Sequence, residues 1–150
     1  MNTLPRHIAP PCSKRRQLCV AVAAAITSAV ARAEPVPRVH PDRRWYDAAE
    51  SMRRLAMSWG DQPYGAVLVT AGGLVAEGPS RVVRNGDPNA HAEREAIREA
   101  QRRLGTKELE GSVLYSTSRP CRLCEQAAAQ AKVSRMFFGP ELVDAGAPRL

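Results

Sequence analysis

The sequence predicts a three-layer α/β/α domain around a mixed sheet, and three observations support this fold class. Segments with helical spacing alternate with short apolar runs typical of strands, in the order helix, two strands, helix, strand, helix, strand. A tight turn separates the first two strands, which predicts an antiparallel hairpin, whereas helices separate the later strands, which predicts parallel pairing. The 150 residues, of which 44% are hydrophobic and 25% charged, suit a single folded domain.

The first 33 residues have the composition of an export signal. The twin-arginine pair at 15–16 precedes an apolar run over 19–31, and small residues lead to a cleavage site before Glu34. We therefore expect residues 1–33 to be a signal peptide of twin-arginine type and the mature chain to be periplasmic or secreted. A mitochondrial presequence or a buried helix is the alternative interpretation, and the apolar run is short for a membrane span.

The formal net charge of +7 is concentrated in the same segment. Residues 1–33 hold five Lys or Arg and no acidic residue, so the rest of the chain carries only 17 basic against 15 acidic residues. A domain this close to neutral has no strong electrostatic attraction for phosphate backbones. A nucleic-acid partner is therefore not expected from the charge.

The mature chain opens with a proline-rich lead-in over 34–41, and residues 42–60 then predict an amphipathic helix. Asp42 is a candidate N-cap and Gly60 is the stop. The apolar positions recur at spacings of three and four, which places them on one buried face. They are Trp45, Ala48, Ala49, Met52, Leu55, Ala56 and Trp59.

Four short apolar runs predict the strands of the sheet. Residues 64–70 form a nearly unbroken run that suits a strand covered on both faces, and residues 74–77 can return as its hairpin partner. Residues 112–117 and 134–139 predict the two later strands. The segment 78–89 is rich in turn-forming residues and predicts a loop, and the last eleven residues of the chain are expected to be irregular.

Two further helices are expected, over 90–104 with Asn89 as the candidate cap, and from Pro120 onward. The apolar stripe of the first contains Ala96, Ile97, Ala100 and Leu104. Glu93 falls on that same stripe. A carboxylate that faces a core is costly unless a partner compensates, which indicates a function for Glu93. The alternative is an ordinary helix-start Glu that is favoured by the helix dipole.

Two pairs of residues have the spacing of metal ligands and their catalytic neighbour: His91 with Glu93, and Cys121 with Cys124 on one helix face. One His and two Cys supply the N and S ligands that zinc prefers, and three protein ligands leave the fourth position of a catalytic site open. A redox pair would explain the two Cys but not the His and Glu. His40 could close the site, although no pattern places it there. Because helix starts favour anions, they would help to keep both Cys as thiolates.

This combination, H-x-E followed by P-C-x-x-C, is typical of zinc-dependent nucleobase deaminases. Zinc at such a site would supply hydroxide near neutral pH, and Glu93 could carry protons to a ring nitrogen and to the amino group that leaves as ammonia. On a regular helix, however, residues two apart point in nearly opposite directions. His91 and Glu93 can converge only if His91 lies at the irregular start of the helix.

Residues 42–139 resemble the cytidine/deoxycytidylate deaminase superfamily, especially its branch of guanine deaminases and tRNA adenosine deaminases. The matching pieces are Pro63 to Val67, Asp87 to Glu93, Ala96-Ile97, Leu114 to Thr117, Pro120 to Cys124, and Phe138-Gly139. The resemblance implies a mixed five-stranded sheet and a homodimer or higher homo-oligomer. It implies a Zn2+ ion at His91, Cys121 and Cys124, with Glu93 as proton shuttle, and substrate contacts at Ser80, Ala92, Ser118 and Pro120.

Three departures from the family pattern concern the substrate and not the metal. Ser80 stands where relatives commonly carry Asn, Arg119 stands where they commonly carry Glu, and the chain ends soon after the fourth predicted strand. The interpretation is an exported zinc-dependent hydrolase that deaminates a free nucleobase or nucleoside, with a guanine-like purine first and a cytosine-type ring second. The alternatives are a catalytically silent zinc-binding scaffold and a secreted effector deaminase that acts on nucleic acid.

Overall fold

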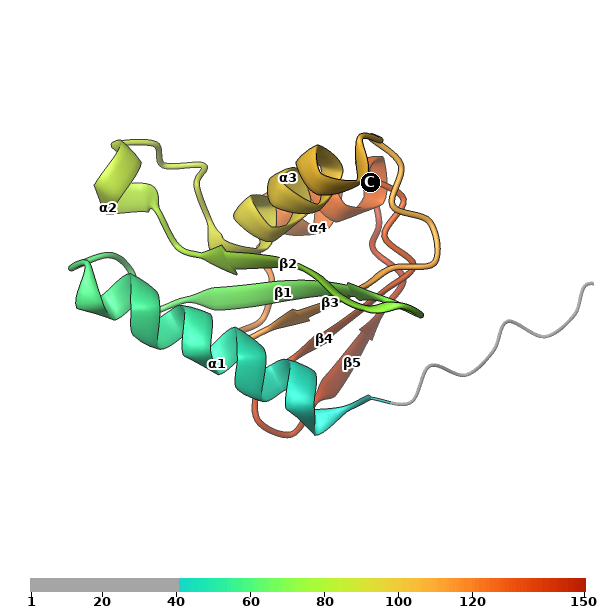
Figure 1. The fold of residues 1–150 in the computed structure, drawn as a ribbon, viewed down its shortest axis with the longest axis horizontal. Helices are drawn as coiled ribbons and strands as arrows, with labels where there is room; N and C mark the ends of the chain where they lie inside the picture. Colours follow the sequence, from blue (N-terminus) through green and yellow to red (C-terminus); the bar gives the residue numbers. More distant parts are fainter. Residues whose placement is uncertain (1–40) are drawn as a thin grey trace, which may run out of the picture. The chain divides into compact units, whose positions relative to one another are not determined.

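The computed structural model describes residues 41–150, which form a five-stranded sheet between helices (Figure 1). Helix α1 (Arg43–Ser58) covers one face of the sheet, and α3 (Ala92–Leu104) and α4 (Arg122–Gln130) cover the other. The three-layer α/β/α fold with a mixed sheet is therefore confirmed. The predicted signal peptide (1–33) and the lead-in up to residue 40 lie outside the described residues. In the part of the chain that the structure describes, no helix has the length and apolar character that a membrane crossing requires.

Helix α1 begins where the sequence predicts, because the Asp42 side chain accepts a hydrogen bond from the Arg44 amide at 3.0 Å. Ala49 and Ala56 on the predicted stripe are fully buried against the sheet, whereas Leu55 is 37% exposed. Tyr46, which the stripe does not include, is buried. The small side chains bring the helix close to the sheet, and Tyr46 adds to the buried surface of the helix.

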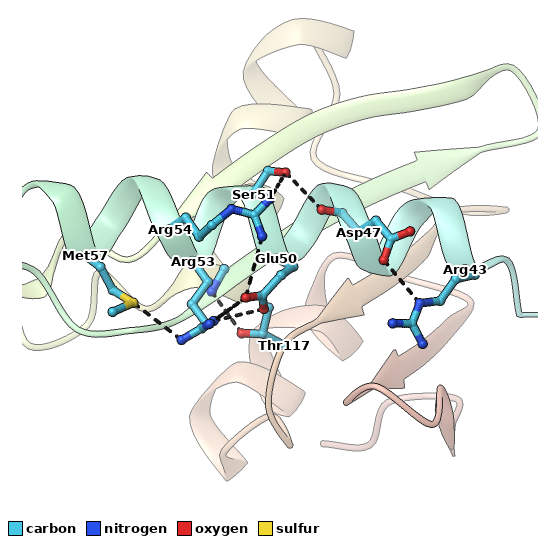
Figure 2. Close-up of polar contacts among 9 residues, drawn as sticks. Arg43, Asp47, Glu50, Ser51, Arg53, Arg54, Met57 and Thr117 are labelled. Atoms are coloured by element: carbon cyan, nitrogen blue, oxygen red, sulfur yellow. Dashed lines mark hydrogen bonds and ion pairs between the residues drawn. The ribbon is translucent and has the colours of Figure 1, made fainter.

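The outer surface of α1 carries ion pairs between successive turns (Figure 2). Arg43 pairs with Asp47 at 3.1 Å, and Arg53 forms hydrogen bonds with both carboxylate oxygens of Glu50. The hydrogen bond from Arg53 holds the pKa of Glu50 below its ordinary value. Exposed pairs of this kind contribute little to stability, so the burial of the opposite face holds α1 in place.

The sheet has the strand order β2-β1-β3-β4-β5. Strands β1 (Gly65–Thr70) and β2 (Gly73–Pro79) form the predicted antiparallel hairpin. Strand β3 (Val113–Ser116) pairs antiparallel with β1 and parallel with β4 (Arg135–Phe138), so the predicted parallel pairing holds for β3 and β4. Because β3 and β4 are parallel, their carboxyl ends lie at the same edge of the sheet. The chain continues from the end of β3 towards α4 and from the end of β4 towards β5.

Strand β5 (Val143–Gly146) shows that the prediction of an irregular C-terminal segment was wrong. It pairs antiparallel with β4 and forms the edge of the sheet. The Arg135 guanidinium on β4 donates to both carboxylate oxygens of Asp144 at 2.6–3.0 Å. Because the side chains of β5 are mostly exposed, the strand has no apolar alternation that the sequence could reveal, and backbone pairing with β4 determines it.

The segment between β2 and α3 also differs from the prediction in two respects. The expected loop over 78–89 contains the end of β2 and a short helix, α2 (Val82–Asn85). Helix α3 begins after His91, which occupies the cap position, so Asn89 is not the cap. Instead, Asn89 lies in a turn in which its amide donates to the Asp87 carboxylate at 2.8 Å. Because the Asn89 amide is hydrogen-bonded within this turn, the helix begins two residues later than predicted, at Ala92.

Two apolar clusters fill the space on the two faces of the sheet. The cluster under α3 and α4 contains Ala66, Leu68, Ala76, Ala92, Ala96, Ile97, Ala100, Leu109, Leu114, Ala128, Ala131, Val133 and Met136. The cluster under α1 contains Ala49, Val67, Val69, Val113, Tyr115 and Phe137. Leu104, predicted to join the first cluster, is 49% exposed.

Two glycines set how closely the helices approach the sheet. A Cβ at Gly65 would overlap the backbone of α1 at Ala49, and a Cβ at Gly78 would overlap the backbone of α3 at Ala92 and Ala96. The start of α3 therefore lies directly against β2, which places the residues around His91 at the edge of the buried core.

Candidate metal centre and its cavity

The metal-ligating residues lie at the starts of two helices. His91 precedes α3 with φ −65° and ψ 152°, and Cys121 precedes α4 with φ −72° and ψ 166°. Both residues occupy the N-cap position in extended conformation, yet neither side chain caps its helix by a hydrogen bond. Cap residues usually satisfy the free amides of the first turn. Here both side chains are directed away from the helix and towards each other.

The ligand atoms of His91, Cys121 and Cys124 lie within 4.8 Å of one another. The Nδ1 atom of His91 is 3.6 Å from the Cys121 sulfur and 3.5 Å from the Cys124 sulfur, and the two sulfurs are 3.5 Å apart. Ligands at zinc bond lengths of about 2.0–2.3 Å in a tetrahedron are separated by about 3.4–3.8 Å. Both the donor atoms and their spacing therefore fit zinc, with a fourth position left for a non-protein ligand.

Glu93, in the first turn of α3, is 5% exposed and lies beside this set. Its Oε1 accepts a hydrogen bond from the buried Ser116 hydroxyl at 2.8 Å, and its Oε2 is 3.4 Å from the Cys124 sulfur. His91 and Glu93 converge because His91 is in the cap conformation and not in the helix, as the spacing requires. The hydrogen bond from Ser116 compensates part of the cost of burying the carboxylate.

The sulfur of Cys124 is in a different environment from that of Cys121, because Cys124 is buried and Cys121 is exposed. Burial raises the pKa of the Cys124 thiol well above its ordinary value, and the negative charge of Glu93 raises it further. The expectation that helix starts help to keep both Cys as thiolates stays a prediction for the zinc-bound state. A bound cation such as zinc would ionise this thiol and release its proton.

A cavity of about 390 Å³ opens beside the ligand set. Its walls are formed by Gln62, Tyr64, His91, Glu93, Ser118, Arg119 and Cys121. The volume is in the range of small-molecule sites. Two of the three predicted metal ligands line the cavity together with Glu93 and Ser118, whereas the third ligand, Cys124, is buried and does not line it.

The other predicted substrate contacts do not line this cavity. Ala92 is fully buried in the core, and Pro120 is half-buried beside a neighbouring hollow on the side of β4 and β5. Ser80 is fully buried, and its hydroxyl donates to Asp61 at 2.9 Å. Their assignment as substrate contacts therefore rests on the resemblance alone.

Three residues of the site were not identified from the sequence. Gln62 and Tyr64 lie in the turn between α1 and β1 and line the cavity, and Ser116 supports Glu93. Tyr64 and Ser116 lie within two of the pieces that carry the family resemblance, Pro63 to Val67 and Leu114 to Thr117, but they were interpreted there only as strand residues. Gln62 lies outside every such piece.

The comparison with protein families matches residues 39–140 to the cytidine and deoxycytidylate deaminase zinc-binding region. Among curated proteins, the chain is 41% identical over 83 residues to a guanine deaminase of Bacillus subtilis (strain 168), a match that covers 55% of this chain and 53% of that protein. It is also 41% identical over 83 residues to a tRNA-specific adenosine deaminase of Aquifex aeolicus (strain VF5), with 55% of each chain covered. The chain thus spans about half the length of these curated relatives.

Solved structures show the same two similarities. The X-ray structure of the Bacillus subtilis guanine deaminase superimposes with a TM-score of 0.63 and 33% identity, covering 67% of this chain and 64% of that one. A structure from a study of A-to-I editing by tRNA:A34 deaminases gives a TM-score of 0.63 and 35% identity, covering 65% and 71%. The two groups of relatives are equally close by these measures.

Proposed function

Because the chain belongs to the cytidine and deoxycytidylate deaminase family, we propose that it is a zinc-dependent hydrolase that releases ammonia from a free nucleobase or nucleoside. A guanine-like purine is the first candidate substrate, and a cytosine-type ring is the second. The observation that carries the proposal is the position of Glu93, a buried carboxylate that lines the same cavity as the metal ligands His91 and Cys121. A purely structural zinc site would not require it.

In this mechanism His91, Cys121 and Cys124 would hold zinc, which would make hydroxide available near neutral pH. Glu93 would take a proton from the attacking water and give it to a ring nitrogen. It would then take the remaining proton of the hydroxyl group formed on the ring carbon and give it to the amino group, which leaves as ammonia while the carbonyl forms. The overall reaction consumes water and replaces the amino group by oxygen with loss of ammonia. Ser116 holds Oε1 of Glu93, so that the carboxylate keeps one orientation through these transfers.

The choice of a purine is supported by the relatives. One group is named for guanine and the other for adenosine, and both of these substrates carry the amino group on a purine ring. The near-neutral charge of residues 34–150 supports a small substrate over a polynucleotide.

Deamination of adenosine in RNA is the second candidate. It is supported by the tRNA deaminase relatives and by Arg119, which lines the cavity, is exposed, and forms no ion pair among the described residues. A cation at the mouth of the cavity could contact the phosphate of a nucleotide whose base enters it. The departures at Ser80 and Arg119 keep a silent zinc-binding scaffold as the third candidate.

We also propose that the chain is exported and acts as a homodimer or higher homo-oligomer. The twin-arginine pattern of residues 1–33 supports export, and the family resemblance supports the oligomer. A mass measurement on protein recovered outside the cytoplasm should give a chain that begins at Glu34, and an uncleaved chain confined to the cytoplasm would overturn export.

The test of the activity is ammonia release by the zinc-loaded chain from guanine, cytosine, their nucleosides, and an adenosine-containing RNA hairpin. We expect release from guanine and a loss of about 10²- to 10⁴-fold in Glu93→Gln, because general acid–base catalysis typically contributes that much. Glu110→Gln, at an exposed carboxylate, is the matched control and should retain full activity. Release from the hairpin alone would support the second candidate, and bound zinc with no release from any substrate would support the scaffold.

A further inference from the structure

Gln62 is a wall of the cavity that the mechanism above does not use. Its side chain is half-buried and lines the same space as His91 and Glu93. Its backbone is fully engaged, since the amide donates to Asp61 at 2.7 Å and the carbonyl accepts from Tyr64 at 2.8 Å. Within residues 41–150, its carboxamide forms no hydrogen bond. A carboxamide has two donor hydrogens and an acceptor oxygen, and these remain available to a molecule in the cavity.

The turn that carries Gln62 is held in place by Asp61, whose side chain is buried. Its Oδ1 accepts from the Ser80 hydroxyl at 2.9 Å, and its Oδ2 accepts from the Arg84 amide at 2.8 Å. Burial alone would raise the pKa of Asp61, but these hydrogen bonds outweigh it and lower the pKa. The ionised carboxylate thus ties the turn to the end of β2 and to α2, so Gln62 is presented to the cavity by a fixed backbone.

Tyr64 provides a flat apolar surface in the same wall. It is 41% exposed although it is a large aromatic residue, and it lines the cavity one residue beyond Pro63. Its carbonyl accepts a hydrogen bond from the Ser80 amide at 3.0 Å, which fixes its backbone beside that of Gln62. An exposed aromatic ring next to a free carboxamide suits a planar heterocycle that stacks on one and hydrogen-bonds to the other.

We propose that Gln62 determines substrate specificity by forming paired hydrogen bonds with the lactam edge, N–H beside C=O, of a purine that stacks on Tyr64 while Glu93 acts on its amino group. This rests on the proposed function and deepens it. A carboxamide is complementary to a cyclic amide, because each offers one donor and one acceptor in parallel. In guanine the amino group that leaves and the lactam are separate groups, so one can face Glu93 while the other faces Gln62.

Adenine does not fit this arrangement as a substrate. Its exocyclic amino group is both the leaving group and the only donor on that edge of the ring, so no lactam remains for Gln62 to contact. Ser80, which the resemblance indicates as a substrate contact, has its hydroxyl committed to Asp61. Among the other polar wall residues, Ser118 has a single hydroxyl and Arg119 has donors only, so neither offers a donor and an acceptor in parallel as the Gln62 carboxamide does.

The test measures binding of guanine and of 2-aminopurine, which keeps the 2-amino group but lacks the C6 oxygen and the N1 hydrogen. Calorimetry on the full zinc-loaded chain carrying Glu93→Gln avoids consumption of the base. We expect Gln62→Met, which keeps the length of the side chain but cannot form these bonds, to weaken guanine binding about 10- to 100-fold, as the loss of a bidentate contact does. Binding of 2-aminopurine should not change.

Gln130→Met, at an exposed position on α4, is the matched control and should leave both affinities unchanged. The unfolding midpoint of Gln62→Met should equal that of the parent chain, because the Gln62 side chain supports no other described residue. Equal effects on the two bases, no effect on guanine, or a parent chain that does not bind guanine would each overturn the proposal.

Ammonia release by the chain with intact Glu93 separates the two hypotheses. Binding that depends on Gln62 without any release would reject the deaminase and retain the specificity role. Release of ammonia from guanine that is unaffected by Gln62→Met would reject the specificity role and retain the deaminase.

Discussion

The cavity has two walls of different origin. The metal wall consists of His91, Glu93 and Cys121 at the starts of α3 and α4, and the turn wall consists of Gln62 and Tyr64 between α1 and β1. Each residue of the metal wall lies directly ahead of a helix or in its first turn, and the third ligand, Cys124, follows Cys121 by three positions. The turn wall depends on Asp61 and its contact with Ser80, 19 residues away in sequence. The side chains of each metal motif are thus set by a helix start, whereas the turn wall, which we propose selects the substrate, has no such motif and depends on Asp61. Bringing the two metal motifs together is itself a long-range contact, because His91 lies 30 and 33 residues from the two Cys.

Loss of one metal ligand should have the largest effect on activity. This effect should act through zinc binding and should leave the turn wall unchanged. We expect Cys124→Ser to lower zinc affinity by more than about 100-fold, since even changes in outer-shell partners cost 10- to 100-fold, and to abolish ammonia release. Zinc content after dialysis and the shift of the unfolding midpoint on adding a chelator measure this. Retention of zinc with parental affinity would show that Cys124 is not a ligand.

Gly78→Ala should have the second largest effect, because it displaces the helix that carries the metal wall. The added Cβ would overlap backbone atoms of Ala92 and Ala96. We expect a loss of about 3 kcal/mol in unfolding free energy, at the upper end of overpacking effects. Denaturant unfolding measures it.

The control for this variant is Gly72→Ala, where the nearest atom is the Thr70 hydroxyl at an ordinary 3.6 Å and little change is expected. Gly65→Ala is the corresponding change under α1 and should destabilise by a similar amount. If Gly78→Ala proves as stable as Gly72→Ala, α3 does not lie against β2 as described.

Asp61→Asn should have the smallest effect and should act on the turn wall. The carboxamide keeps one acceptor but places a donor against the amide or hydroxyl hydrogens that Asp61 accepts, so we expect a loss of about 1–2 kcal/mol in unfolding free energy. Guanine binding should weaken while zinc affinity remains at the parental value.

The same variant makes a prediction about pH. Hydrogen bonds lower the folded-state pKa of Asp61 below its ordinary value of 3.8 despite its burial. The contribution of the ionised Asp61 carboxylate to the unfolding free energy is therefore present above the unfolded-state pKa. It is lost as the pH falls through the lower, folded-state pKa. The difference in unfolding free energy between the parent and Asp61→Asn should be constant near neutral pH and should begin to narrow as the pH falls below 3.8. A difference that stays constant at acidic pH would show that the charge of Asp61 is not what stabilises the turn.

The parts of the fold that could be predicted depend on residues close together in the sequence. The parts that could not be predicted depend on contacts with other segments or on competing local hydrogen bonds. The hairpin and α1 follow from apolar spacing and from Asp42 and Gly60, all of which act on their immediate neighbours. Strand β5 was missed because its side chains are exposed and only pairing with β4 defines it. Helix α3 was predicted two residues too early because Asn89 is used by the turn around Asp87.

The sequence alone determined the family and identified the zinc ligands and the nearby carboxylate, because each motif lies at a helix start and the two Cys form an i, i+3 pair. The tertiary structure brought His91 to the two Cys, which lie 30 and 33 residues away. Only the tertiary structure decided that Ser116 supports Glu93, from 23 residues away, and that Ser80 faces Asp61 while Gln62 and Tyr64 face the cavity. These contacts join residues that no periodic pattern relates. Their geometry exists only once the sheet has brought the ends of β2, β3 and α1 together.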